Sequence, residues 1–182
     1  MMNERREASK GNVQLSWTLG ETVEEVVCES NEVKHQPRKR VNVVSVQLVK
    51  ESSFLYENRV IRNPKDAAVL FREFLGDVDR EYFVVLCLNV KNEPTHLNIA
   101  HIGSLNSSIV HPREVLKPAI LSNAGSVMVC HNHPSGNPEP SPEDIQVTKR
   151  LKNACELIGI QLLDHIILGE DRHVSLKERG EC

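Results

Sequence analysis

One stretch of the chain, residues 126–144, predicts a strand, a loop and a helix that together carry metal-ligating side chains. The short apolar run 126–130, rich in valine, is typical of a buried strand. It leads directly into His131 and His133, which point to the same face if the chain stays extended. With the carboxylate of Asp144 they supply three ligands, a set that suits a tetrahedral zinc ion with one open position. We therefore expect a metal centre of the catalytic type.

The residues after the loop carry the signals of a helix start. Ser141 is a favoured N-cap residue, Pro142 falls on the first helical position, and Asp144 occupies the acidic position of a capping box. If Asp144 were only a cap, the histidine pair upstream would be unexplained, so we interpret it as a ligand. The helix is predicted to end at Gly159. Its expected apolar face consists of Val147, Leu151, Ala154 and Ile158.

The spacing of His131, His133, Ser141 and Asp144 resembles the JAMM motif of the MPN+/JAB metalloproteases. The longer string HNHPSGNPEPSPED, together with LDHIILG and VSLKERG near the end of the sequence, resembles the RadC subfamily. This similarity extends from about residue 41 to about residue 180. The motif is long and contains no gap, which makes the resemblance specific.

The resemblance implies a fold and an activity. The fold is a three-layer JAB/MPN-like (cytidine-deaminase-like) α/β architecture, with helices flanking a mixed central β-sheet. One zinc ion per chain would be held by His131, His133 and Asp144, and a zinc-activated water would cleave a peptide or isopeptide bond. A protein or peptide substrate is therefore the expected partner. Two other hypotheses stay open: a DNA-associated accessory protein in repair or recombination, as the RadC name implies, and a metal-binding module without turnover.

The resemblance also implies a general base. JAMM enzymes carry a glutamate on a strand upstream of the histidines, and Glu81, at the start of EYFVVLCL, matches that position. Glu93 in a polar turn and Glu114 in the first turn of a predicted helix are the alternatives. The family gives the serine of the motif, here Ser141, a part in stabilising the oxyanion beside its role as a cap. Asn132 departs from the best-characterised pattern, which has Ser or Thr there, and leaves the substrate open.

Several other polar residues fall near the motif or within apolar runs. Cys130 adjoins a proposed ligand but faces the other side of the strand, so we expect it in the core. Asp164 and His165 interrupt an apolar run, and we interpret them as a hydrogen-bonded structural pair rather than as part of the site. The remaining histidines considered lack partners at ligand spacing and are predicted to lie on the surface or in loops: His96, His101 and His111.

Strand-like and helix-like segments alternate along the rest of the chain. This alternation predicts a three-layer α/β fold around a mixed sheet. Further helices are expected to begin at Asn63-Pro64, ending at Gly76, and at Pro112, with Pro118 kinking the second or marking a new start. Further strands are predicted at residues 41–50, 81–88 and 96–102, and as a pair at 160–168 and 173–176 across the turn 169–171.

Composition narrows the setting in which the chain works. Its net charge of -3 indicates no global basic surface, so nucleic acid is not favoured as a partner. Five widely spaced cysteines argue against a disulfide framework and for a reducing, cytoplasmic compartment. The sequence contains no apolar stretch long enough to cross a bilayer, and we expect no membrane partner. The oligomeric state stays open.

Residues 1–40 form a polar leader that ends in the basic cluster 37–40. Its few apolar residues predict a disordered or weakly docked arm rather than a domain, followed by one domain at 41–182. Longer RadC-like proteins carry an N-terminal helix-hairpin-helix region, and residues 1–40 show no Gly-x-Gly hairpin pattern for it. The expectation is therefore a stand-alone catalytic module.

Overall fold

A computed structural model describes residues 40–103 and 110–182 of the chain. The chain divides into two units, Met1–Asn42 and Val43–Cys182, and the fold described below is that of the second unit. The predicted leader lies outside the described residues except for Arg40. None of the helices in these ranges combines the length and the apolar character needed to cross a bilayer.

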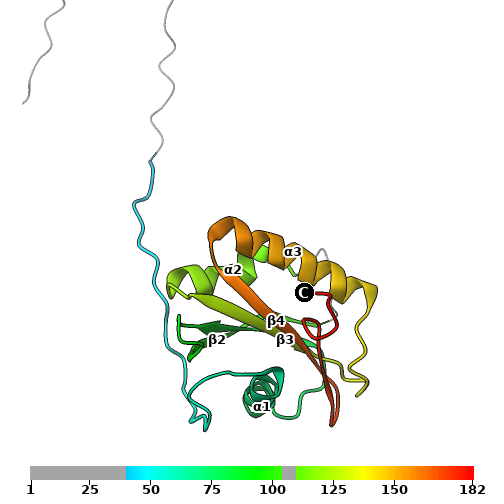
Figure 1. Ribbon diagram of the computed structural model, residues 1–182. Helices are drawn as coiled ribbons and strands as arrows, with labels where there is room; N and C mark the ends of the chain where they lie inside the picture. The colour runs from blue at the N-terminus through cyan, green and yellow to red at the C-terminus, as the bar shows by residue number, and fades with distance from the viewer. Residues whose placement is uncertain (1–39, 104–109) are drawn as a thin grey trace, which may run out of the picture. The chain divides into compact units, whose positions relative to one another are not determined.

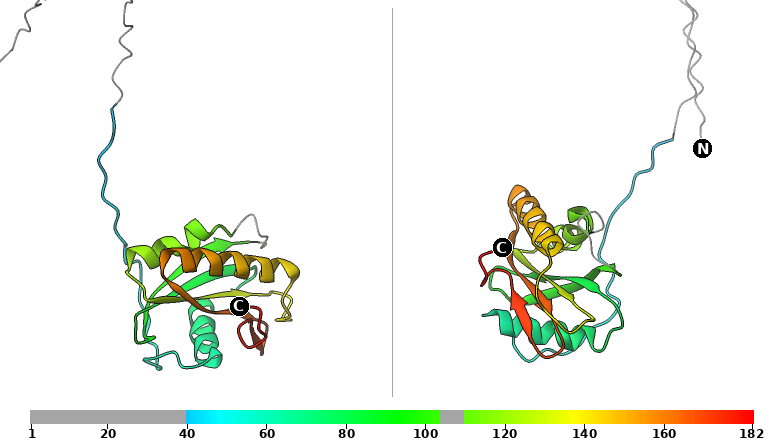
Figure 2. Two further views of the ribbon diagram at one scale, coloured as in Figure 1. Left: turned by 45° about the horizontal axis from the view of Figure 1, so that its top comes forward. Right: turned by 90° about the vertical axis from the view of Figure 1, so that its right-hand side faces the viewer.

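The second unit is a three-layer α/β fold, as the sequence predicted. Helix α1 covers one face of the sheet, and α2 and α3 cover the other (Figures 1 and 2). The elements are, in chain order, α1 (Pro64–Leu75), β1 (Tyr82–Leu88), β2 (Pro94–Ile102), α2 (Pro112–Leu121), β3 (Ser126–Asn132), α3 (Pro142–Ile158), β4 (Gln161–Leu168) and β5 (His173–Ser175).

The sheet is mixed, with strand order β2-β1-β3-β4-β5. Strands β3 and β4 run parallel, whereas the pairs β1–β2, β1–β3 and β4–β5 are antiparallel. Every residue of β3 is buried, which fits a central strand covered on both faces. Because β1 runs against β3 and β4, its first residue Tyr82 lies at the edge where β3 ends at Asn132 and β4 ends at Leu168.

Two apolar cores lie on the two faces of the sheet. One is formed with α2 and α3 and contains Phe83, Val129 and Leu151, and the other is formed with α1 and contains Phe71, Val84 and Ile166. Phe83 and Val84 belong to different cores because successive strand residues point to opposite faces. Burying one such side chain contributes about 1.5–3 kcal/mol.

The helix boundaries follow the capping signals of the sequence. The Asn63 side chain accepts a hydrogen bond from Asp66 N at 2.9 Å, and α1 ends at Gly76 in a positive-φ conformation. α2 runs without interruption through Pro118, so the predicted second start there is wrong. On α3, Ile158 is 44% exposed, and the buried position belongs to Cys155 instead.

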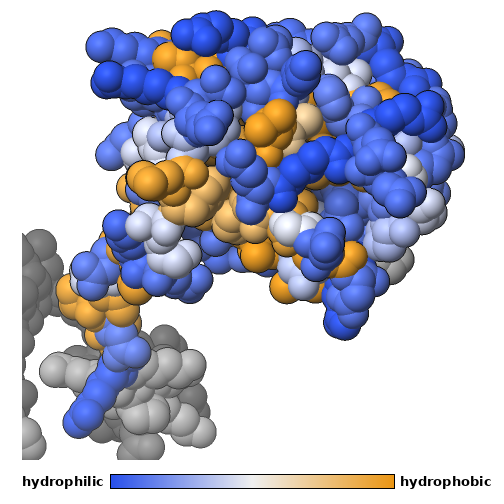
Figure 3. Space-filling model, turned by 90° about the horizontal axis from the view of Figure 1, so that it is seen from below, coloured by the Kyte–Doolittle hydropathy of each residue, from blue (hydrophilic) through white to orange (hydrophobic). Residues whose placement is uncertain are grey.

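The strand predicted at residues 41–50 is absent from the structure. Residues 41–50 are exposed and carry no strand assignment, and Val43 is fully exposed. Figure 3, which views the domain from the α1 side, shows hydrophobic residues scattered among hydrophilic ones on this face. β-branched composition indicates only that a segment suits a pleated surface, while a strand also needs a paired neighbour. The composition therefore predicted a strand at residues 41–50, but these residues pair with no other strand in the described part of the chain.

Candidate metal centre

Three side chains converge where β3 ends and α3 begins. His131 is the second-last residue of β3, His133 follows the strand, and Asp144 is on the first turn of α3. One ligand atom from each lies within 4.8 Å of the others. His131 Nε2 is 2.9 Å from His133 Nε2 and 3.2 Å from Asp144 Oδ1, and His133 Nε2 is 3.6 Å from Asp144 Oδ2. The predicted ligands therefore do meet at one point.

His133 is oriented by the backbone of the loop that it begins. Its Nδ1 lies 2.8 Å from the carbonyl oxygen of Asn137, which can only accept, so Nδ1 carries the proton of the neutral ring. The loop is tied to the end of β4, because His133 N donates to Leu168 O at 2.8 Å and Glu170 N donates to Gly136 O at 3.1 Å. Nε2 of His133 is thus left with a lone pair that faces the other two ligands.

Asp144 is both the acidic residue of the capping box of α3 and a member of the converging group. Its Oδ2 accepts from Ser141 N at 2.8 Å and from Ser141 Oγ at 2.7 Å, which completes the predicted capping box. Burial alone would raise the pKa of Asp144, but the neighbouring side chains of His131, His133 and Ser141 outweigh this effect and hold that pKa well below the usual range. The carboxylate is therefore ionised.

His131 is fully buried and sits deepest in the group. Burial lowers its pKa, although the neighbouring Asp144 acts in the opposite direction. Its ring stacks on Phe83 with 6.1 Å between the ring centroids, and its Nδ1 lies 2.8 Å from Nε2 of His165. Cys130, the preceding residue, is buried in the opposite core as predicted.

The donor set fits a cation. Two imidazole nitrogens and a carboxylate face one another across 2.9–3.6 Å, and a neutral histidine pair of this kind offers acceptors without a donor between them. Such a group is stabilised when a positive charge lies among its lone pairs. Nitrogen and carboxylate ligands of this number are those of catalytic zinc sites. His131, His133 and Asp144 can therefore hold a metal ion.

The predicted structural pair of Asp164 and His165 does not exist as a side-chain pair. The Asp164 carboxylate accepts from Ser175 Oγ at 2.6 Å and from the backbone nitrogens of Lys177 and His165. The His165 ring instead lies between His131 and Thr148, with Nδ1 2.6 Å from Thr148 Oγ1. Asp164 thus fixes the C-terminal turn, and His165 lies beside the candidate metal centre.

His165 and Thr148 were not predicted as members of the site. One sequence signal could have pointed to Thr148, since it lies four residues after Asp144 and so on the same face of α3. No comparable signal exists for His165, because its place beside the site depends on how β4 pairs with β3.

Glu81 immediately precedes β1, at the edge of the sheet where the metal ligands lie. The hydrogen bond that the protonated ring donates to Asp144 is the main cause that raises the pKa of His133, and the charge of Glu81 adds to it. The same charge acts on His131. Glu81 is therefore close enough to act electrostatically on both histidines.

Asn132, between the two histidines, holds the chain around Glu81. Its Oδ1 accepts from Tyr82 N at 2.8 Å and its Nδ2 donates to Arg80 O at 2.9 Å. Both bonds go to backbone groups on the two sides of Glu81. The departure from Ser or Thr at this position thus has a structural role.

Glu93 and Glu114, the alternative candidates for the general base, lie in surface ion pairs. Glu93 accepts from Arg59 at 2.9 Å and from Asn89 at 2.7 Å, in the turn after the far end of β1. Glu114 pairs with Lys117 and Arg113 on α2. Of the remaining predicted surface histidines, His96 and His111 are exposed, whereas His101 is half-buried on β2.

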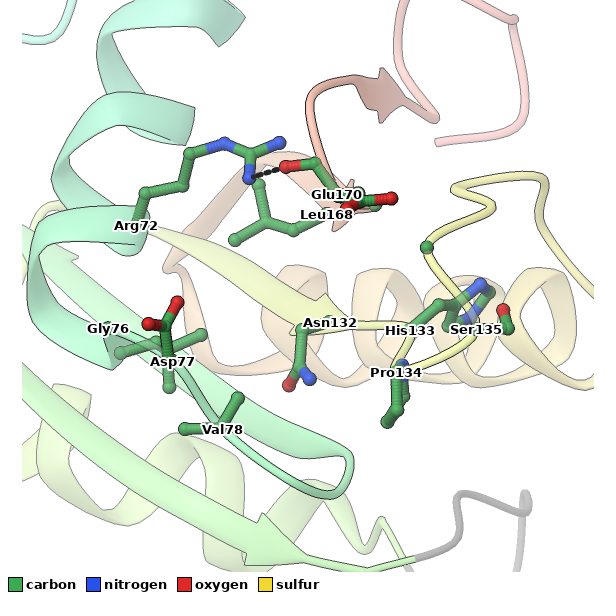
Figure 4. Close-up of a pocket in the computed structure, with 13 residues that line it drawn as sticks. Arg72, Gly76, Asp77, Val78, Asn132, His133, Pro134, Ser135, Leu168 and Glu170 are labelled. Carbon is green, nitrogen blue, oxygen red and sulfur yellow. Dashed lines mark hydrogen bonds between the residues drawn. The ribbon is translucent and has the colours of Figure 1, made fainter.

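A cleft with a volume of about 360 Å³ opens beside His133. Figure 4 shows Arg72, from α1, reaching across it to the backbone at Glu170, with Asn132 and His133 on the other side. Arg72 donates to Glu170 O at 2.6 Å and to Arg172 O at 2.8 Å, which ties α1 to the turn between β4 and β5. The cleft therefore has a fixed wall next to one metal ligand.

Comparison with known proteins identifies similar sequences over the same part of the chain. The family model described as RadC-like JAB domain matches residues 61–181. A UPF0758 protein of Shouchella clausii is 56% identical over 121 residues, which are 66% of this chain and 53% of that protein. A UPF0758 protein of Bacillus cereus is 55% identical over 126 residues, 69% of this chain and 56% of that protein. The chain spans about half the length of these relatives.

Proposed function

Because the chain belongs to the RadC-like JAB domain family, we propose that it is a zinc-dependent hydrolase that cleaves amide bonds in peptides or isopeptides. The observation that supports this most is the convergence of His131, His133 and Asp144, whose ligand atoms lie within 4.8 Å of one another. Two nitrogens and one carboxylate are the protein ligands of many hydrolytic zinc sites. When bound there, zinc polarises a substrate carbonyl and lowers the pKa of water.

Glu81 supplies the proton transfers in this proposal. It is not one of the three converging ligands, yet its charge acts on both histidines. Its carboxylate takes the proton of the water that attacks the carbonyl carbon and returns it to the nitrogen that departs. The two hydrogen bonds of Asn132 to the backbone at Arg80 and Tyr82 hold Glu81 in place for both transfers.

Ser141 stabilises the oxyanion in the same proposal. Its hydroxyl donates to Asp144 Oδ2 at 2.7 Å and accepts from Asp144 N at 3.2 Å, so the group is placed beside a ligand but its proton is already in use. To serve an oxyanion, the hydroxyl must rotate away from Asp144. The capping box still keeps the bond from Ser141 N to Asp144 during such a rotation.

The substrate would lie in the cleft beside His133. Its walls carry Arg72, Asp77 and Glu170 as well as backbone groups, so it offers polar partners to a polypeptide. Because the Arg72 guanidinium is bound to two backbone carbonyls, that wall is held in shape before a substrate arrives.

The test combines metal content with turnover. Purified protein loaded with zinc is mixed with an internally quenched peptide library and, separately, with lysine ε-amide substrates. We expect about one zinc per chain and hydrolysis that a chelator stops. His131→Ala should lose both zinc and hydrolysis, whereas His96→Ala, at an exposed position on β2, should keep both. Zinc-loaded wild type that hydrolyses neither kind of substrate would contradict the proposal.

A further inference from the structure

We propose that His165 and Thr148 are positioning residues of the metal centre, which keep the proton of His131 on Nδ1 and so leave Nε2 free to bind the metal. They do so through a buried chain of hydrogen bonds that runs from the backbone of α3 to the ligand. This inference rests on the proposed metal site, but it does not depend on which bond the protein cleaves.

Thr148 determines the direction in which the hydrogen bonds of this chain run from donor to acceptor. A hydroxyl has a single proton, and Thr148 Oγ1 donates it to the carbonyl oxygen of Asp144 at 2.6 Å, since a carbonyl can only accept. The same oxygen lies 2.6 Å from His165 Nδ1 and can therefore only accept there. The His165 ring must donate, so its proton is on Nδ1.

The proton position on His165 in turn determines the proton position on His131. A neutral imidazole carries one N–H, so His165 Nε2 has a lone pair and accepts. His131 Nδ1, 2.8 Å away, must then be the donor. That leaves the lone pair of His131 on Nε2, which is the atom that faces Asp144 Oδ1 at 3.2 Å.

Burial protects this chain of hydrogen bonds from rearrangement. Thr148, His131 and His165 each have no exposed surface, so no bulk water competes for these bonds. Phe83 packs on both rings, with ring-centroid distances of 6.1 Å to His131 and 5.4 Å to His165. A neutral His165 fits this place because its ring nitrogens face a hydroxyl and another imidazole.

The two histidine ligands are thus held by different means. His133 donates from Nδ1 to a backbone carbonyl of its own loop, at Asn137. His131 lies inside the sheet, and in the described part of the chain the partner of its Nδ1 is His165 instead of a backbone carbonyl. One turn of α3 supplies both a ligand, Asp144, and the residue that anchors the chain, Thr148.

The experiment uses the full chain and the pair Thr148→Val and Thr148→Ser. Valine keeps the branched shape but removes the hydroxyl, whereas serine keeps the hydroxyl. Metal-free protein is examined by long-range ¹⁵N–¹H correlation spectra, which report which nitrogen of His131 is protonated, and zinc affinity is measured by competition with a chelator. In wild type and Thr148→Ser we expect protonation at Nδ1 of His131. In Thr148→Val we expect protonation at Nε2 to appear and zinc affinity to fall about 10- to 100-fold, as for other residues that orient ligands.

The wild-type spectrum alone can overturn the inference. If His131 is protonated at Nε2 in folded wild type, the chain does not act as proposed, whether or not Thr148→Val folds. Equal zinc affinity and equal spectra for the two folded variants would also overturn it. Absence of amide hydrolysis would count against the proposed function only, since neither measurement here uses turnover.

Discussion

Asn132 and Tyr82 are joined by a hydrogen bond of 2.8 Å from the Tyr82 backbone nitrogen to the Asn132 side-chain oxygen. The same side chain donates to Arg80 O at 2.9 Å, so one amide group is hydrogen-bonded to the backbone on both sides of Glu81. Because Asn132 itself stands between His131 and His133, the position of Glu81 is tied directly to the positions of these two histidines. The relationship predicts that changes at Asn132 act on Glu81 without removing a ligand.

Asn132→Asp should lower the free energy of unfolding by about 1–3 kcal/mol, because Arg80 O loses its donor and meets a carboxylate instead. Zinc content should stay near that of wild type, while hydrolysis falls. Urea unfolding, elemental analysis and turnover measure the three effects. Asn153→Asp makes the same chemical change at an exposed position of α3 and should leave all three unchanged. Wild-type stability of Asn132→Asp would show that the bond to Arg80 contributes nothing.

Glu81→Gln should separate proton transfer from metal binding. Glutamine keeps the size of the side chain but cannot take a proton, so hydrolysis should fall by about two to four orders of magnitude. Zinc content should not change, because Glu81 is outside the ligand group. Glu143→Gln, at an exposed position in the first turn of α3, is the matched control and should retain full activity. If Glu81→Gln hydrolyses at the wild-type rate, another carboxylate is the base.

Ser141 variants should distinguish the cap from the oxyanion role. Ser141→Ala removes the cap and should cost about 0.5–2 kcal/mol of stability. Ser141→Asn restores an acceptor for Asp144 N and should recover most of that loss, but it has no hydroxyl. We therefore expect hydrolysis to stay low in both variants, with thermal unfolding as the measure of stability. Wild-type turnover in Ser141→Asn would leave capping as the only role of the hydroxyl.

Gly169→Ala should disturb the metal centre indirectly, by displacing the loop that follows His133. A Cβ at this position would lie 2.7 Å from Pro138 Cδ and would also meet the carbonyl oxygen of Gly136, in the loop that orients His133. Such overpacking costs about 1–3 kcal/mol. The loop must move, so zinc affinity, measured by chelator competition, should fall about tenfold or more.

Gly180→Ala provides the control for this substitution. Gly180 has a φ of +76°, so alanine is strained there, but nothing lies within 4 Å of its added Cβ. It should lower stability by about 1–2 kcal/mol and leave zinc affinity unchanged. If both variants lose zinc affinity equally, the effect is general destabilisation and not a shift of the loop.

The sequence by itself determined those parts of the protein that depend on near neighbours in the chain. The cap at Ser141, the start of α3 at Pro142 and the end of α1 at Gly76 lie where predicted, because capping bonds join residues three or four apart. The convergence of His131, His133 and Asp144 could be predicted for the same reason. An extended His-x-His and a helix start a few residues later leave little freedom in their relative placement.

Only the tertiary structure decided which distant residues support the ligands. His165 faces His131 because β4 pairs in parallel with β3 and sets His165 opposite Val129. A slip of one residue would turn His165 to the other face of the sheet, and nothing local in the sequence specifies that register. The same holds for the hydrogen bond between Asn132 and Tyr82, which are fifty positions apart. It also holds for residues 41–50, whose strand-like composition finds no pairing partner within the described residues. Propensity describes what a segment can do, whereas pairing depends on a partner that the rest of the fold must bring to it.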